Sequence, residues 1–163
     1  MSTLLRNRDR ARDRARDLGG LAEWYAADPA SWPGPPRFNP DDRWYSRLAR
    51  TEDHEAWLLT WLPGQSTELH DHGGVGGAFT VLAGHLTEAV PTRGPSVRLV
   101  ERSYGPGATR RFGVQHVHRV VNSGSVPAVS LHVYSPVLTR MTRYAVEAGE
   151  LRTLAVEQAG RDW

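Results

Sequence analysis

Residues 64–84 read GQSTELHDHGGVGGAFTVLAG and set two histidines, His70 and His72, one residue apart between glycine-bounded, strand-like runs. Side chains i and i+2 of a β-strand point to the same face, so on a strand this pair would direct two imidazoles into one space. Imidazole is a common metal ligand, although it also occurs on polar strand faces and in buried hydrogen-bond networks. The pair predicts a metal site if the rest of the chain supplies further ligands.

The length of 163 residues predicts one domain that buries a core without disulfides. The net charge is only +2, and all 20 basic residues are arginines opposed by 18 acidic ones, which favours no nucleic-acid partner. Cysteine is absent, which excludes a disulfide, a thiolate metal site and a catalytic thiol. A metal must therefore be held by His, Asp or Glu.

The N-terminal part predicts helices. Thr3–Asp17 alternates arginine with aspartate, a pattern of i,i+4 pairs on a solvated helix face, and a second helix is expected over Leu18–Ala27. The proline-rich residues that follow predict an irregular crossing. No signal-peptide core or run of 18 apolar residues occurs, so we expect a cytoplasmic protein without a membrane partner.

From Trp44 onward, short strand-like runs are separated by Gly, Pro, Asn and Asp at spacings of about ten residues. This pattern predicts an all-β sandwich or barrel that wraps a pocket. We expect one domain over residues 1–163, with a helical and irregular extension over 1–43 packed outside a barrel over 44–157.

Three more histidines could complete a metal site. His118 lies on the run VHRVV, His116 lies two residues before it, and His132 lies on SLHVY. His118 with the H-x-H pair would make a three-nitrogen site with open positions for water or substrate, and His116 is the rival third ligand. Neutral imidazoles leave the charge of a divalent metal uncompensated, which favours an anionic ligand such as a thiolate.

These residues resemble the cupin superfamily. Gly64, the H-x-H pair and Gly84 match its first motif, with Gly77 where the motif has a metal-binding glutamate. His118 is followed by Asn122 as in the second motif. The segments WLPGQSTELHDH, HRVVN and PAVSLHVYSP are similar to those of the bacterial cysteine dioxygenases, which belong to the thiol dioxygenases, over residues 44–152. The resemblance implies an all-β, jelly-roll-like cupin fold with one or two N-terminal helices.

The resemblance also implies a cofactor and ligands. Fe(II) would be held by His70, His72 and His118, with L-cysteine and O2 as the small-molecule partners. The substrate carboxylate would be bound by Arg47 in the segment Tyr45-Ser46-Arg47, with Tyr45 beside it. A planar, two-pronged guanidinium suits a buried carboxylate. Arg43 and Arg50 are nearby alternatives.

The resemblance also implies a relay of three hydrogen-bonded side chains. Ser130, His132 and Tyr134 alternate along one strand face and match the family's Ser-His-Tyr set, in which a serine holds an imidazole that holds a phenol near the metal. Trp61 coincides with a family position on the pocket wall, although it also suits an ordinary core. The cysteine that animal members crosslink to this tyrosine is replaced by Gly77, so no crosslink can form.

The implied reaction is the oxidation of L-cysteine to cysteine sulfinic acid. The alternatives are a 3-mercaptopropionate dioxygenase, which has glutamine in place of the anchoring arginine, and a non-catalytic metal-binding cupin whose arginine-rich N-terminal helix binds a partner. We expect a monomer or a weak homo-oligomer.

Overall fold

The computed structural model describes residues 17–159, and the helix expected over Thr3–Asp17 lies outside them except for its last residue. The described part contains a single α-helix, one short 3-10 turn and antiparallel strands. Their order is α2 (Leu18–Ala26), η1 (Pro29–Ser31), β1 (Trp44–Arg50), β2 (Glu55–Trp61), β3 (Leu69–His70), β4 (Gly76–Ala83), β5 (Leu86–Pro91), β6 (Leu99–Tyr104), β7 (Thr109–Phe112), β8 (Arg119–Val121), β9 (Ala128–Ser135), β10 (Arg140–Glu147) and β11 (Glu150–Gln158).

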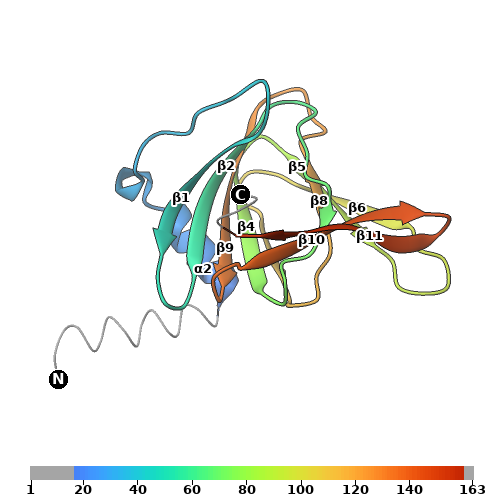
Figure 1. Cartoon of the computed structure of the whole chain (residues 1–163). Coiled ribbons are helices and arrows are strands. Elements are labelled where there is room, and N and C mark those ends of the chain that lie inside the picture. Colours follow the sequence, from blue (N-terminus) through green and yellow to red (C-terminus); the bar gives the residue numbers. More distant parts are fainter. Residues whose placement is uncertain (1–16, 160–163) are drawn as a thin grey trace.

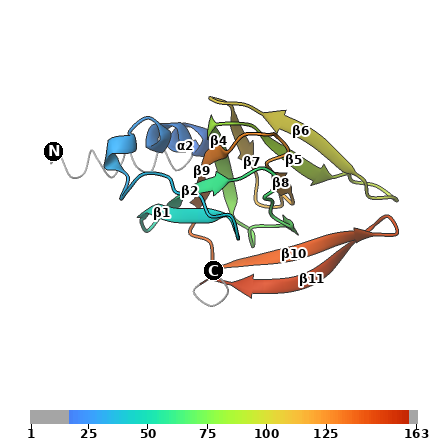
Figure 2. The ribbon, with the colours of Figure 1, turned by 90° about the horizontal axis from the view of Figure 1, so that it is seen from above.

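The strands form three antiparallel sheets: β1-β2-β9-β4-β7, β11-β10-β3 and β6-β5-β8. The long β10–β11 hairpin lies on the side of the molecule opposite α2 (Figures 1 and 2). This arrangement confirms the predicted all-β cupin class with helical structure packed outside. The division of residues 1–163 into an extension and a barrel stays a prediction.

The three central strands of the five-stranded sheet, β2, β9 and β4, are buried on both faces. On β9, Leu131 and Val133 face α2 and join its apolar residues in one cluster. Ser130, His132 and Tyr134 take the intervening positions and are buried on the other face. The second cluster fills the interior and includes Trp61 and Phe79. The period of two thus sets one strand between a helix and an enclosed pocket.

Helix α2 begins where Asp17 accepts a hydrogen bond from the Gly20 N–H at 3.1 Å, a cap that satisfies one otherwise free amide. Leu21 and Ala22 are buried against the sheet. The expected end at residue 27 differs from the observed end at Ala26 by one residue, and the prolines from Pro29 onward prevent continuation. Within residues 17–159, no helix is long and apolar enough to cross a membrane.

Candidate metal centre and pocket

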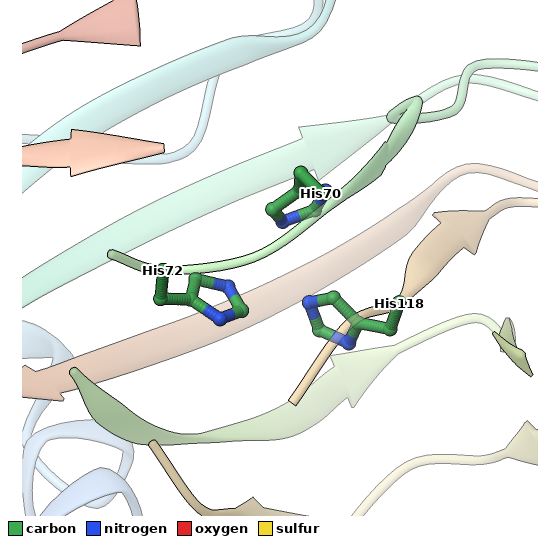
Figure 3. A group of neighbouring side chains, drawn as sticks. All are labelled: His70, His72 and His118. Atoms are coloured by element: carbon green, nitrogen blue, oxygen red, sulfur yellow. The ribbon is translucent and has the colours of Figure 1, made fainter. Parts of the chain in front are cut away.

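The three histidines His70, His72 and His118 converge on one space (Figure 3), and one ring nitrogen from each lies within 4.8 Å of the others. His70 ends the two-residue strand β3, whereas His72 lies beyond it in the following loop. His118 precedes β8 and forms an isolated antiparallel bridge with His70. Only His70 of the H-x-H pair lies within β3, and the chain turns after His72, where the Val75 N–H donates to the His72 carbonyl at 3.2 Å. The imidazoles meet in one space.

Asp71 fixes the loop that carries His72. Its carboxylate accepts hydrogen bonds from the N–H groups of Gly73 at 3.0 Å and Thr142 at 2.9 Å, and from the Tyr144 hydroxyl at 2.7 Å. Burial alone would raise the pKa of Asp71, but these hydrogen bonds outweigh it and hold the pKa below its usual value. The loop is thus tied to β10 by a charged group.

The hydrogen bonds of two histidines leave one nitrogen each for a metal. Nδ1 of His70 lies 2.8 Å from the Glu68 carbonyl, which can only accept, so Nδ1 carries the proton and Nε2 is free. His118 Nδ1 donates to the Glu88 carboxylate at 2.8 Å in the same way. Both nitrogens of His72 are buried without a hydrogen-bond partner among the described residues. Such an orphaned buried imidazole is explained by a metal ligand role, so this donor set fits a transition metal.

The imidazoles are neutral at physiological pH. Burial, with His118 nearby, lowers the pKa of His70 to about 3, and burial among the other histidines holds the pKa of His72 well below its usual value. Burial also lowers the pKa of His118, although its hydrogen bond to Glu88 opposes the shift. Neutral imidazole is the form that binds metal, so no proton must be displaced.

Glu88 is a buried carboxylate behind His118 that sequence reasoning missed. It accepts hydrogen bonds from His118 at 2.8 Å, His116 at 2.7 Å and Arg110 at 2.8 Å, and Tyr104 lies 3.3 Å away. Burial would raise the pKa of Glu88, but its hydrogen bonds outweigh it and lower the pKa far below the usual value. The charged carboxylate fixes the ring orientation of His118. In the sequence Glu88 is an ordinary strand residue, and only the register of β5 with β8 reveals its partner.

A second group of possible ligands consists of Glu88, His116 and His118. The side chains of this group already satisfy one another's hydrogen bonds, because both histidines donate to the same oxygen of the Glu88 carboxylate. A metal there would have to displace those hydrogen bonds, whereas the group with His72 contains unpartnered nitrogens. The structure therefore places His116 behind His118, and it favours His118 as the third ligand.

Gly77 lies where a cupin glutamate would be, and the structure has no room for a side chain there. A Cβ at Gly77 would lie 2.5 Å from the Phe112 ring and 2.8 Å from the Val133 carbonyl oxygen. Phe112 itself stacks on His72, with ring centroids 4.7 Å apart, and on His116 at 5.0 Å. The phenyl ring thus takes the space beside the metal ligands and supports two imidazoles.

A pocket opens beside the histidines. Its lining combines polar groups with an apolar wall and consists of Arg43, Tyr45, Trp57, Leu59, Trp61, Thr67, His70, His118, Val120, His132, Tyr134, Leu138, Met141 and Arg143. Tyr45 and Trp61 both line this pocket, where Tyr45 is half exposed and Trp61 is fully buried, and their role in substrate binding stays a prediction.

The predicted carboxylate anchor, Arg47, does not line this pocket. Its side chain is exposed, and its guanidinium lies over the outer ring of Trp57 at 5.5 Å. Arg50 is also exposed and lies at the end of β1. Arg43, the remaining alternative, does line the pocket, and its guanidinium lies 5.0 Å from the centroid of Trp61.

Arg43 is the pocket arginine without a charged partner. Its Nε is buried without a hydrogen-bond partner, and within residues 17–159 no carboxylate lies at ion-pair distance from it. Burial lowers the pKa of Arg43, and the nearby Asp42 carboxylate opposes the shift. Arg143, by contrast, is bonded to Glu157 at 2.6 Å and Glu68 at 3.3 Å. The pocket therefore contains one guanidinium without an ion-pair partner among residues 17–159, and such a group can bind an anion.

The relay residues are hydrogen-bonded in series. Ser130 Oγ lies 2.8 Å from His132 Nε2, and His132 Nδ1 lies 3.4 Å from the Tyr134 hydroxyl. Burial lowers the pKa of His132 to about 3, and burial with Glu55 nearby raises the pKa of Tyr134 well above its usual value. The Tyr134 ring lies 5.3 Å from that of His72, so a neutral phenol lies beside the metal ligands.

The sequence matches the family described as cysteine dioxygenase type I over residues 7–147. The chain belongs to that family. Membership and the three-histidine group together support a cupin thiol dioxygenase.

Solved structures with the same fold include a protein with a double-stranded β-helix domain from Klebsiella pneumoniae subsp. pneumoniae MGH 78578. It is 21% identical, the match covers 73% of this chain and 90% of that one, and the TM-score is 0.50. KdgF from Halomonas sp. is 16% identical over 61% of this chain and 84% of its own, with a TM-score of 0.51. At these identities the likeness shows the fold alone.

The close approach at Gly77 generates a prediction about this family member. Gly77→Ala should lower the free energy of unfolding by about 1–3 kcal/mol, because the new methyl group meets an aromatic ring and a backbone oxygen that cannot both retreat. The neighbouring Gly76→Ala is the matched control, since its Cβ would make contacts of 3.5 Å or more. Urea unfolding of the metal-free proteins measures both, and equal stability of the two variants would contradict the close packing.

The buried carboxylate generates a second prediction. Glu88→Gln should raise the metal dissociation constant about tenfold or more, because His118 loses its charged acceptor and its fixed orientation. Glu101→Gln is the control, since that glutamate is exposed and its ion pair with Arg119 is long, at 3.5 Å. Anaerobic Fe(II) titration against a competing chelator gives both constants. Equal affinities of the wild-type and Glu88→Gln proteins would show that the carboxylate does not support the ligand.

Proposed function

We propose that this protein is an Fe(II)- and O2-dependent dioxygenase that oxidises L-cysteine to cysteine sulfinic acid. The observation that carries the proposal is Arg43, whose Nε is buried without a hydrogen-bond partner among the described residues, in the same pocket as His70, His118 and Tyr134. A small thiol that also bears a carboxylate matches this pocket, because the carboxylate suits the guanidinium of Arg43 and the thiolate suits a metal held by the histidines. Family membership supports the same reaction class.

The donor set suits a thiolate. His70, His72 and His118 would hold Fe(II) through neutral nitrogens, which leave the charge of the ion uncompensated inside a buried site. Bound Fe(II) would supply the redox-active centre at which the thiol and O2 react. A glutamate at position 77 would have added a competing negative charge, and the packing of Phe112 excludes it.

Arg43 replaces Arg47 as the proposed carboxylate anchor. It faces the pocket, stacks on Trp61 and retains unused donors, whereas Arg47 lies at the exposed surface. A guanidinium offers two parallel N–H donors in the geometry of a carboxylate. Fixing the carboxylate at one end of the substrate aligns its sulfur with the histidine group at the other.

Tyr134 is the proposed hydrogen-bond donor to the reacting oxygen. Its raised pKa keeps the phenol protonated, so it can donate but carries no charge that would repel a thiolate. The reaction adds both oxygen atoms of O2 to the sulfur: the sulfur is oxidised from thiol to sulfinic acid, O2 is reduced, and no external reductant is needed. The apolar wall from Trp57, Leu59 and Leu138 keeps bulk water from the site.

Oxygen uptake by the Fe(II)-loaded protein tests the proposal. With L-cysteine, one mole of sulfinate should form for each mole of O2 consumed. 3-Mercaptopropionate carries the same carboxylate without the amine and is the matched competitor, so the proposal predicts the higher kcat/KM for cysteine. A higher kcat/KM for 3-mercaptopropionate would make that thiol the substrate instead of cysteine. Metal binding without thiol-dependent oxygen uptake would favour a non-catalytic cupin.

The two arginines give a paired prediction. Arg43→Ala should raise the KM for cysteine by about a hundredfold, because the carboxylate loses a charge-assisted, two-pronged partner, while iron content stays the same. Arg47→Ala, at an exposed position within the adjoining strand β1, should change KM less than about twofold. Steady-state oxygen uptake with iron quantified in parallel measures both. The reverse pattern would return the anchor to Arg47.

The cytoplasmic location, the absence of a nucleic-acid partner and the monomeric or weakly oligomeric state stay predictions from the sequence.

A further inference from the structure

Trp61 joins the two parts of the pocket that the proposed function uses. The face of its indole ring lies 5.0 Å from the guanidinium of Arg43, and its Nε1–H donates a 2.8 Å hydrogen bond to Ser130 Oγ. Trp61 and Ser130 are both fully buried. An indole N–H can only donate, so Ser130 must accept from it.

The hydrogen bond from Trp61 restricts the one that Ser130 can make to His132. The Ser130 hydroxyl has a single hydrogen, and His132 Nε2, at 2.8 Å, is the acceptor that the described residues provide for it. If His132 carried its proton on Nε2 instead, Ser130 would accept two hydrogen bonds and its own hydrogen would have no acceptor in a fully buried position. Buried groups are rarely left in that state.

We infer that Trp61 is a positioning residue that sets the direction of the chain from Ser130 through His132 to Tyr134. His132 then accepts at Nε2 and carries its proton on Nδ1, which faces the Tyr134 oxygen at 3.4 Å. Tyr134 accepts from His132 and keeps its own O–H to donate into the pocket. Reversal of the chain would turn that O–H toward His132 and away from the pocket.

This inference rests on the proposed function only for its catalytic consequence, because the direction of the chain is a property of the protein alone. The neutral state of His132 agrees with it, since burial lowers the pKa of that ring to about 3 and leaves one ring proton. Free imidazole side chains favour the proton on Nε2, so the opposite tautomer at His132 identifies the direction.

The test is the tautomer of His132. Long-range ¹H–¹⁵N NMR spectra of the full chain loaded with diamagnetic Zn(II), at neutral pH, distinguish a protonated from an unprotonated ring nitrogen, and His132→Gln assigns the signals. The wild-type ring should be protonated at Nδ1. Trp61→Phe keeps the aromatic face under Arg43 but removes the N–H, so the Nε2–H form should become populated.

Trp57→Phe is the matched control. Trp57 is on the same strand and lines the same pocket, but its Nε1 is buried without a partner among the described residues, so its removal should leave the tautomer unchanged. Ser130→Ala, a smaller change, should shift the tautomer as Trp61→Phe does. An Nε2–H proton in the wild-type protein overturns the inference. So does a shift in Ser130→Ala without one in Trp61→Phe.

The catalytic consequence is measured separately by oxygen uptake. Trp61→Phe and Ser130→Ala should each lower kcat for cysteine about tenfold, less than the loss of a direct proton donor, and the double variant should lose no more than either single one. KM should stay within about twofold because the stack under Arg43 is kept. If the predicted tautomers appear but no thiol is oxidised, the proposed function fails and the inference stands. Additive losses in the double variant would overturn the shared chain.

Discussion

The candidate metal centre depends on one antiparallel bridge. The backbone N–H of His70 donates to the carbonyl of His118 at 2.9 Å, and the N–H of His118 donates back at 3.0 Å. These two hydrogen bonds join the end of β3 to the residue just before β8, and these two strands belong to different sheets. Two of the three histidines are thereby held opposite each other by backbone alone, and Asp71 brings the third from the adjoining loop.

Around this bridge, charge is distributed in a consistent way. The histidine rings are neutral and buried, a carboxylate lies behind His118, and an unpaired guanidinium lies across the pocket. The Glu88 carboxylate thus lies behind His118 and not among the three histidines. The packing of Phe112 excludes a glutamate from position 77. A site of this kind has room for a ligand's own negative charges, a thiolate at one end and a carboxylate at the other.

The sequence predicted the all-β fold and the pattern of alternating strands, because a period of two is a local property of each segment. The convergence of His70, His72 and His118 was also predictable, although only His70 lies within a strand and His72 lies just beyond it, in a segment that Asp71 ties to β10. The roles of Glu88 and Arg43 could not be read in the same way. Strand register decides which carboxylate lies behind His118, and the pocket arginine, Arg43, comes from the irregular segment just before β1 and not from β1 itself.

The central claim is that the three-histidine group and the pocket beside it add O2 to the sulfur of a carboxylate-bearing thiol. Mass spectrometry of the product made by the Fe(II)-loaded protein from L-cysteine under ¹⁸O2 tests it most directly. The account predicts a sulfinate that contains two ¹⁸O atoms. A product with one labelled atom, or a disulfide without any, would contradict it.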